Sequence, residues 1–232
     1  FLTVPEVAEK PNRVKENIIE SYFKLWDQLK SLYKQAPETL KFLIASAIYR
    51  DGLAGVFAFG GALGALAFGF ELAEVILFGI AANVMAGIGA AIGGVLDDKI
   101  GGKRVIMGSL LGLTIAGFGV FAFASLGPIT YWVGGLALTL FVGPAQASSR
   151  AFVSRFTPAG REGEVMGLYM TTGRAVSFLS PLLWTTSISI ALSMGINNAQ
   201  ATVWGILGLM VVLVAGILLL ARVSPNPQII TN

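Results

Sequence analysis

The stretch GGVLDDKIGGKR, residues 93–104, interrupts a sequence that is otherwise almost free of charge from residue 42 to residue 221. The apolar runs on either side are close to the ~20 residues that a helix needs to cross ~30 Å of hydrocarbon. Over the whole chain, 55% of the residues are hydrophobic and 12% are charged, whereas an average soluble domain has about 25% charged residues. The composition therefore indicates an integral, multi-pass membrane protein.

Short connectors divide the apolar sequence into six segments of about this length. We expect membrane-spanning helices at residues 40–67, 72–96, 105–125, 129–149, 164–191 and 201–221. The runs are too long to be the ~10-residue alternating strands of a membrane β-barrel. The predicted fold class is an all-α membrane protein, with a six-span bundle over residues 39–223.

Lysine and arginine are distributed unevenly among the connectors. The connectors after the first, third and fifth spans have none, and every basic residue except Arg50 and Arg174 lies in the other connectors or near the chain ends. The positive-inside rule makes the basic side cytoplasmic, so both ends of this segment, including a tail at 224–232, are expected there. The membrane is expected to be the cell (inner) membrane, or the vacuolar membrane in a eukaryote. The net charge of +3 follows from this topology, and no nucleic-acid partner is expected.

The first residues have a different pattern. Over residues 12–35, apolar side chains recur every three or four positions, with lysines and acids between them, which predicts an amphipathic helix ended by Pro37. We expect residues 1–38 to be a cytoplasmic linker whose helix lies on the bilayer surface or on the ends of the spans. A regulatory or partner-binding helix is the alternative. Since the chain opens with Phe1 and shows no cleavable signal pattern, we interpret it as an internal piece of a longer protein.

The available side chains limit the chemistry. The chain has no cysteine and no histidine, which removes thiol chemistry, imidazole acid–base catalysis and the commonest zinc ligands. We expect no cofactor and no metal. A membrane-embedded enzyme is disfavoured because no nucleophile–base pair is available.

The segment AGIGAAIGG, residues 86–94, looks like a loosened dinucleotide-binding fingerprint. That motif needs a preceding strand and an acidic residue about twenty positions later, and neither is present. Gly89 and Gly93 are instead expected to form a small-residue packing face within a helix. The same is expected of two further pairs, Gly60 with Gly64 and Gly108 with Gly112.

Three charged residues lie deep inside the spans. Arg50 and Asp51 are about eleven residues into the first span and Arg174 about ten into the fifth, which places them ~15 to 17 Å deep at ~1.5 Å per residue. A charge at that depth costs ~2.5 to 3.5 kcal/mol on the insertion scale. We expect these residues to handle substrate or protons in a cavity, and Asn83 and Gln146 to line the same cavity. The alternative is a structural ion pair between Asp51 and Arg174.

The opening stretch supplies a motif that the positive-inside rule leaves partly unexplained. Its aspartates stand at the C-terminal end of the second span, where the helix dipole is already negative. The pattern resembles the loop motif G-x-L-x-D-[RK]-x-G-x-[RK]-[RK] of the major facilitator superfamily, which joins the second and third helices of a six-helix half. The matching residues are Gly94, Leu96, Asp98, Lys99, Gly101, Lys103 and Arg104. We expect Asp98 to pair with Arg150 or Arg155 in a cluster that holds the cytoplasmic side shut.

A narrower resemblance covers most of the chain. Residues 48–61, 79–104 and 143–183, which begin IYRDG, GIAAN and GPAQA, resemble the C-terminal half of the vacuole-effluxer-like branch of that superfamily, whose members include autophagy-related amino-acid exporters. The resemblance implies a six-helix half-bundle whose partners are an N-terminal six-helix half, the lipid bilayer and a small-molecule solute. It also implies secondary active transport of small solutes, such as amino acids or related metabolites, by alternating access. The alternatives are a proton-coupled exporter of drugs or sugars, and a scaffold or receptor that does not transport.

Overall fold

The computed structural model describes residues 30–158 and 160–224, and the regular secondary structure within them is all helical, without strands. Residues 30–35 are helical, and the rest of the amphipathic helix expected at 12–35 lies outside the described residues. The helices that follow are α2 (Pro37–Phe68), α3 (Leu72–Ile100), α4 (Gly102–Ala122), the 3-10 turn η1 (Ala124–Leu126), α5 (Pro128–Arg155), α6 (Glu162–Ala175), α7 (Leu179–Ser193) and α8 (Asn198–Ala221). Taken with α6 and α7 as one segment, six helices are long and apolar enough to cross a membrane. The predicted all-α, six-span fold is confirmed.

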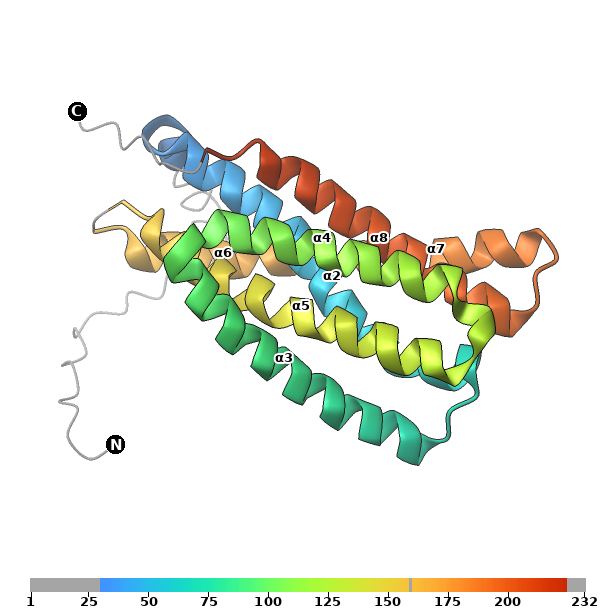
Figure 1. Ribbon diagram of the computed structural model, residues 1–232. Helices are drawn as coiled ribbons and strands as arrows, with labels where there is room; N and C mark the ends of the chain where they lie inside the picture. Colours follow the sequence, from blue (N-terminus) through green and yellow to red (C-terminus); the bar gives the residue numbers. More distant parts are fainter. Residues whose placement is uncertain (1–29, 159, 225–232) are drawn as a thin grey trace, which may run out of the picture.

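The helices pack side by side into one bundle. Helix α5 lies between α3 and α4, and α8 lies beside α4 (Figure 1). Helix α8 also packs against α2 and α7. Helix α8 is the most buried of the spans, whereas α3 and the α6–α7 segment lie at the edges and are the least buried.

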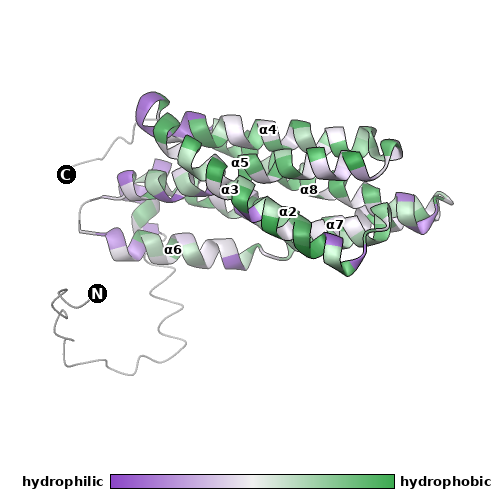
Figure 2. Ribbon diagram, turned by 60° about the horizontal axis from the view of Figure 1, so that its bottom comes forward, coloured by the Kyte–Doolittle hydropathy of each residue, from purple (hydrophilic) through white to green (hydrophobic). Residues whose placement is uncertain are grey.

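Four parts of the chain meet at one end of the bundle. Glu38 at the start of α2 accepts a hydrogen bond from the backbone N–H of Ser224, just beyond α8. Lys103 at the start of α4 donates to the carbonyls of Ala221, the last residue of α8, and of Val223 just beyond it. Thr39 donates to the carbonyl of Phe156 at the end of α5. Figure 2 shows hydrophilic residues concentrated at this end, where α3 meets α4. The basic connectors therefore lie together, and which side of a membrane they face stays a prediction.

The small-residue packing expected in α3 is present. A Cβ atom at Gly89 would overlap the carbonyl oxygen of Leu140, and one at Gly93 would overlap Pro144. Pro144 has no N–H to donate to the Leu140 carbonyl, so that carbonyl is free to face α3. Gly143 makes the reciprocal contact, against the Ala86 carbonyl. The backbones of α3 and α5 are therefore in direct contact.

For the other two glycine pairs, the predicted close packing is found at only one glycine of each pair. A Cβ atom at Gly64 would meet the ring of Tyr131, and one at Gly112 would meet Phe141. Gly60 and Gly108 have open space around them. These two positions therefore do not need a glycine for close packing.

The fifth span is broken, contrary to the continuous helix expected over 164–191. Helix α6 ends at Ala175 and α7 begins at Leu179, with a turn between them. The ring of Pro181 would clash with the carbonyl of Ser177 in a continuous helix, and Pro181 cannot donate to it. In the first turn of α7, by contrast, the missing N–H of Pro181 is not needed.

We expect Gly89→Ala to destabilise the protein by about 1–3 kcal/mol, because the methyl group would overlap the α5 backbone. Gly87→Ala is the matched control, since Gly87 lies two residues away with open space around it. It should be neutral or stabilising by up to about 1 kcal/mol, the usual gain for alanine over glycine in a helix. Thermal unfolding in detergent measures both, and equal midpoints for the two variants would contradict the close packing.

Candidate functional site

Two adjoining pockets run along α2, α3, α5 and α6. One has a volume of about 360 Å³ and is lined by residues of α2, α5 and α6 and by the turn after α6. The other has a volume of about 460 Å³ and is lined by residues of α2, α3 and α5. Gln146 and Arg150 line both pockets, so the two form one surface, which we call the polar face. The structure brings together on it all the residues predicted for the solute or proton pathway, namely Arg50, Asp51, Asn83, Gln146 and Arg174.

Arg50 is held against α6 by two contacts with Tyr169. Its Nη1 atom donates to the Tyr169 carbonyl at 2.8 Å, and its guanidinium carbon lies 3.9 Å from the centroid of the Tyr169 ring. A Cβ atom at Gly173 would lie 3.1 Å from the same Nη1 atom. The glycine thus gives the guanidinium room to lie close to the α6 backbone.

Next to Arg50, hydrogen bonds between buried hydroxyl groups join α2, α5 and α6. Ser149 Oγ lies 2.5 Å from the Tyr49 hydroxyl and accepts a hydrogen bond from the Tyr169 hydroxyl at 3.0 Å. These residues were not predicted from the sequence. The available signal was two tyrosines and a serine within otherwise apolar spans, one of them directly beside Arg50.

Asp51 binds the broken span rather than an arginine. Its side chain is 5% exposed, and its Oδ2 atom accepts a hydrogen bond of 2.6 Å from the backbone N–H of Ser180, in the first turn of α7. The Ser180 hydroxyl donates in return to the Asp51 carbonyl at 2.9 Å. A Cβ atom at Gly55 would lie 2.8 Å from Ser180 Cβ, so a glycine is required for this approach.

The alternative interpretation, a structural ion pair between Asp51 and Arg174, is therefore wrong. Both residues line the same pocket, but no ion pair joins them. The break in the fifth span leaves N–H groups at the start of α7 without helical partners. A carboxylate at a helix N-terminus satisfies such a group and is favoured by the helix dipole. Arg174 lies on the preceding half-helix, α6, where it is exposed on the polar face.

Asn83 and Gln146 occupy the α3 and α5 parts of the polar face. The Asn83 amide donates to the Gly79 carbonyl of its own helix at 2.8 Å, which uses one of its two N–H groups. Gln146 lines both pockets, together with Asn83 in one and with Arg50 and Arg174 in the other.

The loop motif forms a turn of one residue. Gly101 alone separates α3 from α4 and has φ +86°, a conformation that favours glycine. This short turn brings the Asp97 carboxylate to the first residue of α4, since a Cβ atom at Gly102 would lie 3.2 Å from Asp97 Oδ1. Asp97 is thus well placed for the N-terminus of α4, although the dipole at the C-terminal end of α3 disfavours an aspartate there.

The aspartate that makes the close ion pair is Asp97, not Asp98 as expected. Arg155 Nη1 lies 2.7 Å from Asp97 Oδ1, and the Asp97 side chain is 5% exposed. Asp98 is 82% exposed and its Oδ1 atom lies 4.0 Å from Arg155 Nη2. Arg155 is thus the partner, as one of the two expected alternatives, while Arg150 lies on the polar face.

The other motif residues are spread around this turn. Lys103 Nζ donates to the carbonyls of Ala221 at 3.3 Å and Val223 at 2.5 Å, where a cation also suits the C-terminal dipole of α8. Lys99, Arg104 and Gly94 are exposed, and Gly94 has open space around it.

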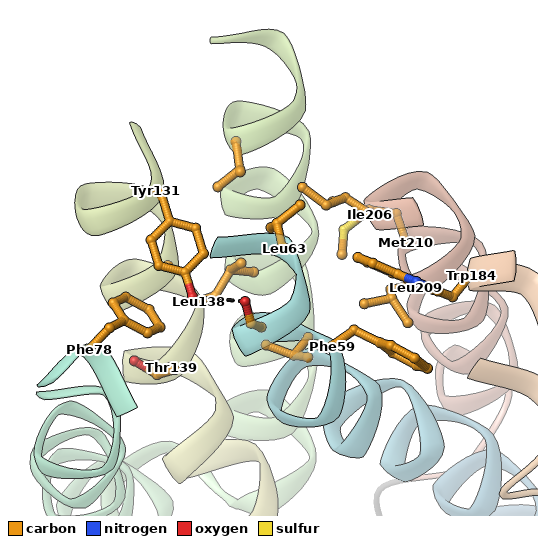
Figure 3. Close-up of a pocket in the computed structure, with 14 residues that line it drawn as sticks. Phe59, Leu63, Phe78, Tyr131, Leu138, Thr139, Trp184, Ile206, Leu209 and Met210 are labelled. Atoms are coloured by element: carbon orange, nitrogen blue, oxygen red, sulfur yellow. Dashed lines mark hydrogen bonds between the residues drawn. The ribbon is translucent and has the colours of Figure 1, made fainter. Parts of the chain in front are cut away.

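A third cavity lies inside the bundle and is apolar. Its volume is about 40 Å³, and Phe59, Leu63, Phe78, Tyr131 and Trp184 are among the side chains around it (Figure 3). The Tyr131 hydroxyl donates to the Gly60 carbonyl at 2.8 Å, and the Thr139 hydroxyl to that of Leu136 at 3.0 Å. With its hydroxyl groups engaged and so little space, this cavity is a packing feature and not a candidate solute site.

Comparison with known proteins gives two findings. A family model described as "Vacuole effluxer Atg22 like" matches residues 1–226. The chain is also similar to a curated protein of Bacillus subtilis (strain 168), described as "Uncharacterized MFS-type transporter YxiO", with 25% identity over 229 residues. The match covers 96% of this chain and 50% of the relative, so the chain spans about half the length of the curated relative it matches.

We expect Asp97→Ala to lower the free energy of unfolding by about 1–2 kcal/mol, because it removes a short ion pair in which Asp97 is buried and Arg155 is half exposed. Asp98→Ala is the matched control and should stay within about 0.5 kcal/mol of the parent, as a surface substitution does. A double-mutant cycle with Arg155→Ala, followed by thermal unfolding, should show coupling to Asp97 and none to Asp98. The reverse result would restore Asp98 as the partner.

We expect Asp51→Ala to destabilise the protein by about 1–3 kcal/mol, since the buried Ser180 N–H would lose its acceptor. Asp51→Asn should cost less, because the amide oxygen can still accept this hydrogen bond. Arg174→Gln should leave the unfolding midpoint unchanged, and its effect should add to that of Asp51→Ala in the double variant. Strong coupling between the two sites would show that they pair after all.

Proposed function

Because the chain belongs to the family of vacuole effluxer Atg22-like proteins, we propose that it forms the C-terminal six-helix half of a secondary active transporter. Its partner is an N-terminal six-helix half, and the two halves move a small solute by alternating access. Amino acids or related metabolites are the first solutes to test, as the effluxer family suggests. Both ends of this segment lie in the cytoplasm in this proposal, on the side of the basic connectors.

The observation that carries the proposal is the polar face. Arg50 lies thirteen residues after Pro37, or ~20 Å along α2 at ~1.5 Å per residue, so the polar face reaches the middle of the span. Ionisable side chains at that depth are expensive in lipid and almost always face protein or a water-filled path. On this half the polar face is open, which fits a surface that meets a second half across a solute path.

The hydrogen bonds and ion pairs described above join helices of this half to one another. Asp51 links α2 to α7, Arg50 links α2 to α6, Arg155 links α5 to α3, and Lys103 links α4 to α8. Such links favour movement of the half as one body. This is the behaviour expected of a transporter in which two halves rock about a solute site between them.

The test is transport by the intact two-half protein in proteoliposomes. Labelled amino acids, organic acids, sugars and drug-like cations are supplied with and without a pH gradient, and flux above empty vesicles is measured. Flux of at least one small solute is expected. Flux of drugs or sugars alone, driven by the pH gradient, would favour the proton-coupled exporter instead. Folded, correctly oriented protein that moves none of these solutes would favour a scaffold or receptor.

A pair of glycine variants connects the flux to the polar face. Gly173→Ala should lower flux several-fold, because the new methyl group would press on the Arg50 guanidinium. Gly167→Ala makes the same change in the same helix at a position with open space around it, and should leave flux unchanged. Equal flux in the two variants would show that the position of Arg50 does not matter to transport.

A further inference from the structure

We propose that the polar face binds an anionic group, a carboxylate or a phosphate, and hence that the transported solute carries net negative charge. This inference rests on the proposed function and adds the chemical class of its solute. The pocket shared by α2, α5 and α6 is lined by the guanidinium groups of Arg50, Arg150 and Arg174, and Asp51 is the one acidic residue among its lining residues.

The one carboxylate in this pocket, that of Asp51, already accepts a hydrogen bond from the protein. Asp51 is buried, and its Oδ2 atom is held at 2.6 Å by the backbone N–H of Ser180. Among the described residues, no acidic side chain lies within ion-pair distance of Arg50, Arg150 or Arg174. Asp51 therefore acts as a cap of α7 and leaves the positive charge of the arginines on the polar face.

The second pocket does not change this balance. Arg150 is the one charged residue among those that line it, and the polar side chains beside it are the amides Asn83 and Gln146. Amide groups can donate to an anion but carry no charge of their own. Along its whole length, the polar face thus offers hydrogen-bond donors and net positive charge.

The arginines are also placed to keep donors available. Arg50 uses Nη1 for the Tyr169 carbonyl, whereas a guanidinium has five N–H donors. Tyr169 fixes this group from the carbonyl and from the ring face, so little side-chain freedom remains to be lost on binding. Guanidinium groups match carboxylate and phosphate oxygens in a planar, two-point geometry, and such pairs are stronger than neutral hydrogen bonds.

The surroundings favour an anion further. Uncompensated charge near the middle of a span is unfavourable, and attraction between opposite charges grows as water is excluded. An anion held between the arginines compensates their charge, and its attraction to them is strong because water is excluded.

The test measures binding separately from transport, with the intact protein in nanodiscs. Succinate and glucose 6-phosphate are titrated calorimetrically beside their uncharged counterparts succinamide and glucose, and beside zwitterionic leucine. At least one anion should bind while its uncharged counterpart does not, and binding should weaken as salt is raised. Succinate binding alone would identify carboxylate as the preferred group, and glucose 6-phosphate binding alone would identify phosphate.

Variants assign the binding to the polar face. Arg174→Gln and Arg150→Gln should each raise the Kd for the anion about tenfold or more, and Arg174→Lys should lose less because it keeps the charge. Arg222→Gln, which removes a positive charge beyond the end of α8, is the matched control and should leave the Kd unchanged. Anion binding that all these variants leave unchanged would overturn the inference.

Two further results would also overturn it. One is binding of leucine, glucose or succinamide with no binding of either anion, which would mean that acids elsewhere in the intact protein neutralise the arginines. The other is no binding of any compound in the panel. Flux assays on the same samples test the proposed function separately. Flux of an uncharged solute would support transport and contradict the anion site. If an anion binds, its binding is lost in Arg174→Gln and no solute shows flux, the anion site is supported and transport is contradicted.

Discussion

A backbone N–H group without a partner is costly in hydrocarbon, because no water is there to accept its hydrogen bond. The break between α6 and α7 creates such groups in the middle of a span, and the carboxylate of Asp51 accepts from one of them. The bond sets the rotation of α2 about its axis. Neighbouring residues of a helix point ~100° apart, so with Asp51 turned to α7, Arg50 is turned to α6 and its tyrosine. One capping bond thus places the central arginine of the polar face.

Much of the fold was predictable because the bilayer itself sets the length of an apolar run. The six spans follow from that length, and Gly89 and Gly93 identify the face of α3 that meets α5. The break after Ala175 was harder to predict. Pro181 was the available signal, but proline is tolerated in membrane helices, so its presence alone does not predict an interruption. The partner of Asp51 is a backbone group, which no side-chain pattern reveals.

The sequence pattern predicted an ion pair at the end of α3 but selected the neighbouring aspartate. A loop motif identifies residues by their spacing, and the match with the superfamily pattern favoured Asp98. The packing face of α3 identifies residues by their direction. Gly89, Gly93 and Asp97 are each four positions apart, so they lie along one side of the helix, and the structure buries all three. The predicted glycine face, continued by one turn, would have selected Asp97.

The depth of the charged residues also bears on how the chain enters the membrane during synthesis. A charge at the centre of a span opposes its insertion by ~2.5 to 3.5 kcal/mol. Helix α2 carries Arg50 and Asp51, and the α6–α7 segment carries Arg174, whereas α8 has no charged residue between Asn198 and Ala221. Helix α8 is the last of these to leave the ribosome, and it packs against both α2 and α7. The two spans that carry charge near their centres therefore gain their full support only when the final helix has joined them, so assembly of this bundle is completed from its C-terminal end.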